Sequence, residues 1–229
     1  MAYSRKRAIL MLGALLSCVI LVAAAVLFVD RPASTWSHEH LRRPAVFDRL
    51  TRYVDPLPTA ATLGIAGVGL AAAFAGWRPG ERGRTLISVC LAILVSEAIK
   101  EQLKILFGRP WPQSWTSGTP SWIGNHAYGF QPLHGGSGWE SFPSGHTAQV
   151  AAIAAVIWLR LPRIRWLGVA MALAVAFALW ASNYHFVGDI LAGALLGTLC
   201  GIGVVAVVCR PTPVRVEYRE MRRPASKPH

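Results

Sequence analysis

Three short stretches of this sequence combine residue types that can bind an anion and move a proton. They read "KILFGR", "PSGH" and "HFVGD". The residues that carry the chemistry in them are Lys104, Arg109, Ser144, Gly145, His146, His185 and Asp189. An imidazole serves as nucleophile or base, a carboxylate orients it, and basic side chains hold phosphate oxygens. The combination indicates phosphoryl transfer, which depends mainly on positioning and charge stabilisation.

The two histidines suggest different roles. His185 stands four residues before Asp189, so in a helical turn the carboxylate can hold one ring nitrogen and leave the other as a free lone pair. Ser144 and Gly145 stand where a helix would begin, and the unpaired N–H groups of a helix start can bind an anion. His146, directly beside them, is then in position to protonate a leaving oxygen.

The elements that would position these residues are membrane helices. Of the 229 residues, 53% are hydrophobic and 15% are charged, and the mean hydropathy is +0.40. That composition favours a membrane protein over a soluble domain. The net charge of +12 fits basic loops that flank membrane spans, so no nucleic-acid partner is expected. The four cysteines show no CxxC spacing, which indicates neither a zinc site nor a disulfide framework.

Six apolar stretches approach the roughly 20 residues that a membrane-spanning helix needs. They are residues 8–29, 57–76, 85–107, 144–161, 164–186 and 187–209. The sequence therefore predicts an all-α integral membrane protein with six transmembrane helices, forming a single domain over residues 1–209. A basic, proline-rich tail follows at residues 210–229, and we expect it to be disordered and cytoplasmic.

Basic residues predict the orientation, because loops rich in lysine and arginine stay in the cytoplasm. They concentrate before the first span, after the second, after the fourth and in the tail, which predicts two cytoplasmic termini. The segment 108–141 then faces outside with Arg109 as its one basic residue, and its tryptophans are expected to anchor it at the membrane interface. These tryptophans are Trp111, Trp115, Trp122 and Trp139. The segment 30–56 also falls outside despite its five arginines, and we expect an amphipathic helix on the outer interface there.

The three stretches resemble the signatures of the type 2 phosphatidic acid phosphatase (PAP2) family, the membrane branch of a superfamily shared with vanadium haloperoxidases. The central signature, Pro-Ser-Gly-His, is intact from Pro143 to His146. The third signature ends in His-x-x-x-Asp, as found from His185 to Asp189. The first signature runs from a lysine to Arg-Pro, and "KILFGRPWP" from Lys104 is similar to it. The resemblance covers roughly the third to the sixth predicted helix.

The resemblance implies a metal-independent lipid phosphatase, acting on a phosphoric monoester or a pyrophosphate without a cofactor. His185 would take the phosphoryl group, Asp189 would orient it, and His146 would protonate the leaving alcohol or phosphate. The phosphoryl oxygens would be held by Lys104, Arg109, Ser144 and Gly145. The resemblance also implies a bacterial inner-membrane protein whose site faces the periplasm or exterior and acts on a phospholipid or isoprenoid phosphate among the membrane lipids.

The sequence departs from the family pattern at two positions. In the usual first signature the arginine stands seven residues after the lysine, but that position holds Trp111, and Arg109 comes two residues earlier. In the third signature a Ser-Arg pair precedes the histidine, but those positions hold Ala178 and Leu179. Either Arg109 and Lys100 compensate or the site is weakened. We expect a variant active site, because both histidines and the aspartate are kept.

Three other classes of protein remain open. An intramembrane serine protease would pair Ser144 with His185, but this leaves Asp189 and the basic residues unexplained. A zinc hydrolase would use His146, His185 and Asp189, but no HExxH spacing supports it. A lipid-binding or transport protein with a degenerate phosphatase site is the main alternative. The substrate also stays open among phosphatidic acid, phosphatidylglycerophosphate, undecaprenyl pyrophosphate and a lipid A phosphate.

Overall fold

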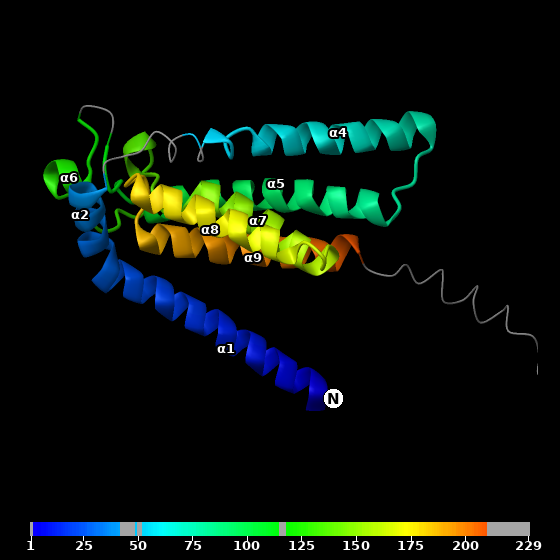
Figure 1. Ribbon diagram of the computed structural model, residues 1–229, viewed down its shortest axis with the longest axis horizontal. Helices are drawn as coiled ribbons and strands as arrows, with labels where there is room; N and C mark the ends of the chain where they lie inside the picture. The colour runs from blue at the N-terminus through cyan, green and yellow to red at the C-terminus, as the bar shows by residue number, and fades with distance from the viewer. Residues whose placement is uncertain (1, 42–48, 50–51, 115–117, 210–229) are drawn as a thin grey trace, which may run out of the picture.

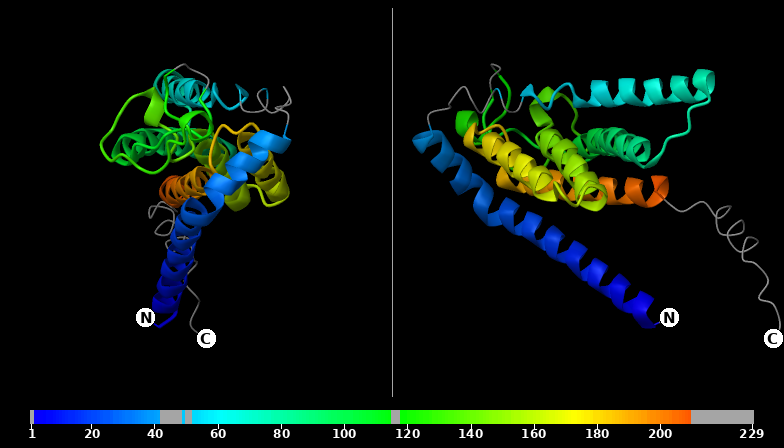
Figure 2. Two further views of the ribbon diagram at one scale, coloured as in Figure 1. Left: turned by 90° about the vertical axis from the view of Figure 1, so that its left-hand side faces the viewer. Right: turned by 45° about the vertical axis from the view of Figure 1, so that its right-hand side comes forward.

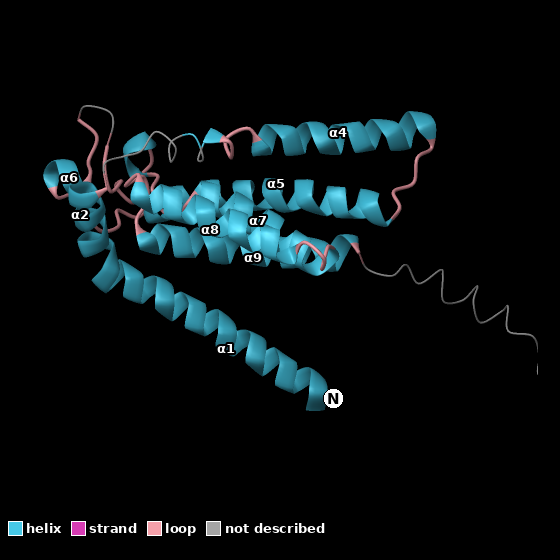
Figure 3. Ribbon diagram, in the orientation of Figure 1, coloured by secondary structure: helices cyan, strands magenta, loops and turns pink. Residues whose placement is uncertain are grey.

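Helices make up the regular structure in the part of the chain that the computed structural model describes, which is residues 2–41, 49, 52–114 and 118–209 (Figure 3). The expected all-α class is confirmed. The elements are α1 (Ala2–Ala24), the π-helical turn η1 (Ala25–Val29), α2 (Asp30–His40), α4 (Leu57–Ala75), α5 (Glu81–Phe107), α6 (Trp122–Asn125), the 3-10 turn η2 (Ser137–Trp139), α7 (Gly145–Arg160), α8 (Arg165–Ala181) and α9 (Val187–Val208).

Each of the six predicted spans coincides with a helix, but the helices differ in how well they suit a membrane. Three stretches are long and apolar enough to cross one: Ile9–His40, Leu57–Ala75 and Val187–Val208. The helix Arg165–Ala181 is apolar but shorter. With its 16 residues, α7 is about 24 Å long, somewhat less than a hydrocarbon core of about 30 Å. The membrane class is therefore supported, while six spans and two cytoplasmic termini stay predictions.

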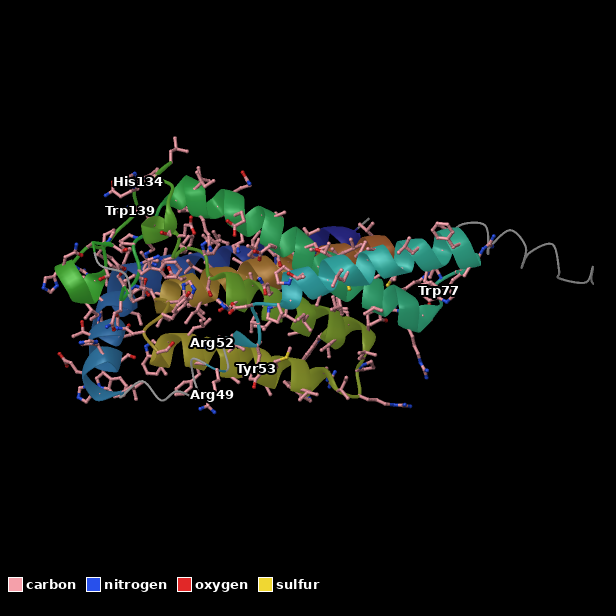
Figure 4. The ribbon with its side chains drawn as sticks, turned by 90° about the horizontal axis from the view of Figure 1, so that it is seen from above. Arg49, Arg52, Tyr53, Trp77, His134 and Trp139 are labelled. Atoms are coloured by element: carbon pink, nitrogen blue, oxygen red, sulfur yellow. The ribbon has the colours of Figure 1, made fainter. Side chains whose placement is uncertain are left out.

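The helices are arranged so that the loops that carry or adjoin the predicted site residues lie at one end of the molecule. α5, α7, α8 and α9 lie side by side, α4 runs along α5, and α1 diverges from this bundle (Figures 1 and 2). The start of α1, the α4–α5 turn and the end of α9 lie at one end, and α2 and α6 lie at the other (Figure 1). In Figure 4, Trp77 marks the first of these ends, and His134 and Trp139 lie toward the second.

Close packing of α7 on α9 depends on glycine. A Cβ atom built on Gly193 would lie 2.3 Å from the carbonyl oxygen of Ser144, and one on Gly197 would lie 2.0 Å from that of Ala148. No side chain fits in that space, so glycine lets the two backbones touch, as small residues do between membrane helices. The contact at Gly193 also fixes the start of α7 against the first turns of α9.

Two predicted segments differ from the structure. The fifth predicted span runs too far, because α8 ends at Ala181 and residues 182–186 form a turn before α9. Ser182 donates its hydroxyl back to the carbonyl of Ala178 at 2.7 Å, and Asn183 adopts a left-handed conformation with φ 55°, which ends the helix. In the expected interfacial helix, Asp30–His40 is helical as α2, directly continuing the first helix, whereas residues 42–48, 50 and 51 lie outside the described residues.

Candidate active site

His185 and Asp189 meet at the turn that joins α8 to α9. The turn is tied to α8, because the backbone N–H groups of Tyr184 and His185 both donate to the carbonyl of Leu179. Asp189 lies in the first turn of α9, where its Oδ2 accepts from the N–H of Phe186 at 3.1 Å and caps the helix. Nδ1 of His185 then lies 3.5 Å from the same Oδ2. The two predicted partners are therefore neighbours, and Nε2 is the ring nitrogen left for other chemistry.

The environment of His185 favours its neutral form. The side chain is 2% exposed, and this burial lowers the pKa of His185 below its ordinary value. Asp189 opposes the shift, whereas the nearby charges of His146 and Lys104 act in the same direction as burial. A neutral imidazole keeps the lone pair that a nucleophile needs.

Asp189 is fully buried and held on both oxygens. Oδ1 accepts from Nη1 of Arg109 at 2.5 Å, and Oδ2 accepts from the hydroxyl of Ser141 at 2.5 Å. Arg109 and Ser141 lie in two loop segments that are joined by backbone hydrogen bonds. The N–H of Ser141 donates to the carbonyl of Arg109, and the N–H of Arg109 donates to the carbonyl of Trp139. The carboxylate therefore has one fixed orientation toward the imidazole of His185.

Arg109 lies behind Asp189 in the protein interior. Its side chain is 0% exposed, and Nη2 donates to Asp30 at 2.7 Å and to the hydroxyl of Tyr128 at 2.9 Å. Burial alone would lower the pKa of Arg109, but Asp189 and Asp30 raise it above its ordinary value. Burial also raises the pKa of Tyr128 to about 12, so its hydroxyl stays protonated. The expected role of Arg109 as a phosphate ligand stays a prediction, and its hydrogen bonds in the structure go to two carboxylates and the hydroxyl of Tyr128.

The "PSGH" stretch begins α7 as the sequence predicts. Ser144 is the N-cap, and its hydroxyl accepts from the N–H of Thr147 at 3.4 Å. The N–H of Ser144 donates to the carbonyl of Asp189 at 3.1 Å, which ties the start of α7 to the start of α9. A Cβ on Gly145 would lie 2.7 Å from Cδ of Lys100, so glycine lets a cationic side chain approach this helix start.

His146 has a carboxylate partner that the sequence analysis missed. Its Nε2 lies 2.8 Å from Oδ1 of Asp55, in the segment directly before α4. The neighbouring Val54 is buried against α7, α8 and α9, which holds Asp55 over the start of α7. The rings of His146 and His185 both contact the ring of Tyr184 in edge-to-face geometry, with centroid separations of 6.0 Å and 5.2 Å. Asp55 stands 91 residues before His146, so no local spacing could have indicated the pair.

The two lysines of α5 differ in how tightly they are paired. Lys100 is 8% exposed, and its Nζ lies 2.6 Å from carboxylate oxygens of both Glu97 and Glu101. Lys104 is 13% exposed, and its Nζ lies 4.0 Å from Glu101. The charge of Lys104 is therefore the less neutralised of the two, and it disfavours the positively charged form of both His146 and His185.

The two departures from the family pattern have structural counterparts. Trp111, at the usual arginine position, packs its ring 5.1 Å from that of His185 and donates Nε1 to the carbonyl of Ser137 at 2.6 Å. This tryptophan, expected to be an interface anchor, therefore lies against the site. Leu179, at the other arginine position, is 0% exposed in an apolar cluster with Val175 and Ile190. That environment would not receive a guanidinium without rearrangement.

Comparison with known proteins identifies the family. The sequence matches the PAP2 superfamily over residues 85–212, which is more than half of the chain. The chain belongs to the PAP2 superfamily. The matched segment contains the three signature stretches, together with most of α5 and the whole of α7, α8 and α9. α1, α2 and α4 precede the PAP2 match, so Asp30 and Asp55 reach the site from outside it.

Similar PAP2 proteins include curated relatives and solved structures. A lipid A 1-phosphatase of Rhizobium johnstonii is 34% identical over 88 residues, 37% of this chain and 36% of the relative. A lipid A 1-phosphatase of Rhizobium etli is 36% identical over 75 residues, 31% of this chain and 32% of the relative. The chain thus spans about a third of the length of the curated relatives it matches.

Two crystal structures also align with the chain. Aquifex aeolicus LpxE is 22% identical, with a TM-score of 0.49 over 78% of this chain and 95% of that one. The first transmembrane PAP2 type phosphatidylglycerolphosphate phosphatase from Bacillus subtilis is 20% identical, with a TM-score of 0.49 over 94% of this chain and 98% of that one.

Proposed function

We propose that this protein is a membrane phosphatase that hydrolyses a lipid phosphate or pyrophosphate at the outer face of the membrane through a phosphohistidine intermediate. The observation that carries the proposal is the approach of four residues at one end of the bundle: Lys104 from α5, His146 from α7, His185 from the α8–α9 turn and Asp189 from α9. These four residues lie in the segment that matches the PAP2 superfamily.

The proposed reaction has two steps. Nε2 of His185 attacks phosphorus, the bond from phosphorus to the leaving oxygen breaks, and His146 gives that oxygen a proton. Water then attacks the phosphohistidine, His146 takes a proton from the water, and free phosphate and neutral His185 are released. Asp189 supports the positive charge that develops on the ring through Nδ1, as the aspartate of a catalytic triad does.

Phosphate oxygens would be held by the cation of Lys104 and by the helix start at Ser144 and Gly145. The N–H of Gly145 would be the backbone donor there, because the N–H of Ser144 already donates to the carbonyl of Asp189. Asp55 supports His146 in its acid form, because a carboxylate beside an imidazole favours the charged ring. We assign Arg109 mainly to holding Asp189, since two carboxylates occupy its terminal nitrogens. The site residues supply acid, base and charge stabilisation without a metal in this scheme.

The substrate class follows from the setting of the site at the end of membrane-type helices. Lipid A 1-phosphatases are the curated relatives, so a lipid A phosphate is the first substrate to test. Phosphatidic acid, phosphatidylglycerophosphate and undecaprenyl pyrophosphate complete the panel. The assay is phosphate release by purified wild-type protein and His185→Ala in detergent micelles, with and without EDTA and vanadate.

We expect release by the wild-type protein that EDTA leaves intact and vanadate inhibits, since vanadate adopts the five-coordinate geometry of phosphoryl transfer. His185→Ala should release no phosphate because it lacks the nucleophile. Activity in His185→Ala would sink the phosphohistidine scheme. Loss of activity with EDTA and its return with zinc would replace the scheme by a metal hydrolase. No release from any lipid of the panel would favour the alternative, a lipid-binding or transport protein with a degenerate site.

The proposed outer location is tested by cysteine labelling. Leu133 is 76% exposed in the long loop at the site end, and Arg82 is exposed at the opposite end of α5. Leu133→Cys, in a background without the four native cysteines, should react with a membrane-impermeant thiol reagent in intact cells, whereas Arg82→Cys should react only after lysis. The reverse pattern would place the site in the cytoplasm.

A further inference from the structure

Asp30 is a buried carboxylate at the junction of the first helix with α2. Its side chain is 0% exposed, and it follows the π-helical turn η1, where its own N–H donates to the carbonyl of Ala25. π-helical turns are rare and frequently occur at functional sites. Asp30 lies far outside the segment that matches the PAP2 superfamily, and nothing in its local sequence resembles a signature.

The contacts of Asp30 lead to the catalytic pair by two routes. Oδ2 accepts from Nη2 of Arg109 at 2.7 Å, and Nη1 of the same guanidinium donates to Asp189 at 2.5 Å. Oδ1 accepts from the N–H of Gly188 at 2.7 Å, and Gly188 is the residue directly before Asp189. Asp30 therefore holds both the Arg109 side chain that binds Asp189 and the Gly188 backbone directly before Asp189, and the orientation of Asp189 depends on both.

Geometry makes this arrangement stiff. A guanidinium is planar, so two carboxylates bound to its two terminal nitrogens are fixed relative to each other. Gly188 also fits tightly, since a Cβ there would lie 2.9 Å from Oδ2 of Asp30 and 2.7 Å from Cγ2 of Val26. The hydroxyl of Tyr128 closes the cluster by donating to the carbonyl of Val26 while it accepts from Arg109.

Stability alone does not explain this cluster. Burying charged groups costs free energy that their mutual attraction often fails to offset, so a buried ion pair is weak evidence for a stabilising role. Asp30, Arg109 and Asp189 together carry one net negative charge, and Nδ1 of His185 faces it at 3.5 Å. A net negative charge at this place stabilises the positive charge that the ring acquires during phosphoryl transfer.

We propose that Asp30 is a positioning residue for the phosphatase reaction, acting through Arg109 and the N–H of Gly188 to hold Asp189 against His185. This inference rests on the proposed function. It means that the first helix, besides any role as a membrane anchor, completes the site.

The test is Asp30→Asn in the full-length protein, assayed for phosphate release on the substrate that the wild-type protein hydrolyses best. Asparagine keeps an oxygen for Gly188 but loses the charge opposite Arg109. We expect kcat to fall between about ten- and a hundredfold, the scale for a reacting group displaced by about 1 Å, with KM changed little. The acid limb of kcat/KM should also move to lower pH, because loss of a negative charge favours neutral His185.

That pH readout separates positioning from general loosening. The charged groups that face His185 are Asp189, His146 and Lys104, and all three are unchanged in Asp30→Asn. The matched control is Ser37→Ala, which removes the bond from a buried α2 hydroxyl to the carbonyl of Trp180 at 3.0 Å and leaves the charge cluster intact. The control should keep the wild-type acid limb.

Each outcome decides one question. A wild-type protein without phosphate release overturns the proposed function and this inference with it. If the wild-type protein is active, Asp30→Asn with wild-type kcat or an unmoved acid limb overturns the inference alone. Asp30→Asn should also cost little in an Asp189→Asn background, since it acts through Asp189, and a full additional loss there would contradict the route. If Asp30→Asn does not fold, Gly188→Ala displaces the same carboxylate, and wild-type kcat in that variant overturns the inference.

Discussion

Replacing Arg109 by alanine is expected to lower both stability and activity, whereas replacing Lys104 should lower activity alone. Arg109→Ala leaves Asp30 and Asp189 buried without their shared cation. Breaking a buried ion pair from one side costs about 3–5 kcal/mol. For a chain of this size each kcal/mol shifts Tm by about 2–4 °C, so Tm should fall by roughly 6–20 °C.

Lys104 provides the contrast because its surroundings are different. Its Nζ lies 4.0 Å from Glu101, and a loose pair of this kind contributes about 1 kcal/mol or less. Lys104→Ala should therefore melt within a few degrees of the wild-type protein. Loss of one group that stabilises transition-state charge lowers turnover by about two to three orders of magnitude, and we expect that loss in Lys104→Ala. Arg109→Ala should lose a similar factor, because Asp189 is no longer held.

Both variants can be measured on one preparation in detergent micelles. The fluorescence of the nine tryptophans reports thermal unfolding, and phosphate release reports turnover at a temperature below every Tm. An Arg109→Ala protein that melts with the wild-type protein would refute the reasoning, since two unpaired buried carboxylates must destabilise the fold. So would a Lys104→Ala protein that melts as early as Arg109→Ala, or one that keeps its turnover, because Lys104→Ala is predicted to lose activity alone.

Three further predictions concern separate parts of the structure. Burial lowers the pKa of His185, and the neutral form is the one that reacts. The acid limb of kcat/KM should therefore have its midpoint below about pH 6.5, as a series of assays from about pH 4.5 to about pH 9 would check. Asp55→Asn should lower the fraction of His146 that is protonated and able to act as the acid, with a loss of about tenfold or more on an alkyl phosphate and little loss on an activated aryl phosphate. Equal losses on both substrates would contradict this role. Gly197→Ala should lower the free energy of unfolding by about 1–3 kcal/mol, seen as a lower Tm, because the added methyl group forces α7 away from α9. Gly203→Ala on the same helix is the control that should not melt early, since a Cβ at Gly203 would meet no neighbouring atom within 4 Å.

Features of the sequence that act over a few residues predicted much of the fold and the site. Apolar runs predicted the helices, because a run near 20 residues must bury its backbone polar groups internally. The four-residue step from His185 to Asp189 predicted their contact, since both lie on one turn. Ser144 was expected where a helix begins, and it is the N-cap of α7, because capping depends on the residues within one helical turn.

One helix end was predicted wrongly although the sequence carried a signal for it. The expected span ran to Phe186, but Ser182 and Asn183 are polar residues typical of turns, and they mark the end of α8 at Ala181. The end is set by the back-bonded hydroxyl of Ser182 and the left-handed Asn183. This turn frees His185 from a helix and directs it toward Asp189.

Only the tertiary structure decided which charged residues meet across long stretches of chain. Arg109 reaches Asp30 across 79 positions, and His146 reaches Asp55 across 91. Such pairs have no period in the sequence, because they depend on where α2 and the start of α4 pack against the loops at the site end. Trp111 against His185 is of the same kind. The sequence by itself determined which groups can perform phosphoryl transfer, since reactivity belongs to residue type and short spacing, whereas the partners that hold those groups were determined by the packing of helices from opposite parts of the chain.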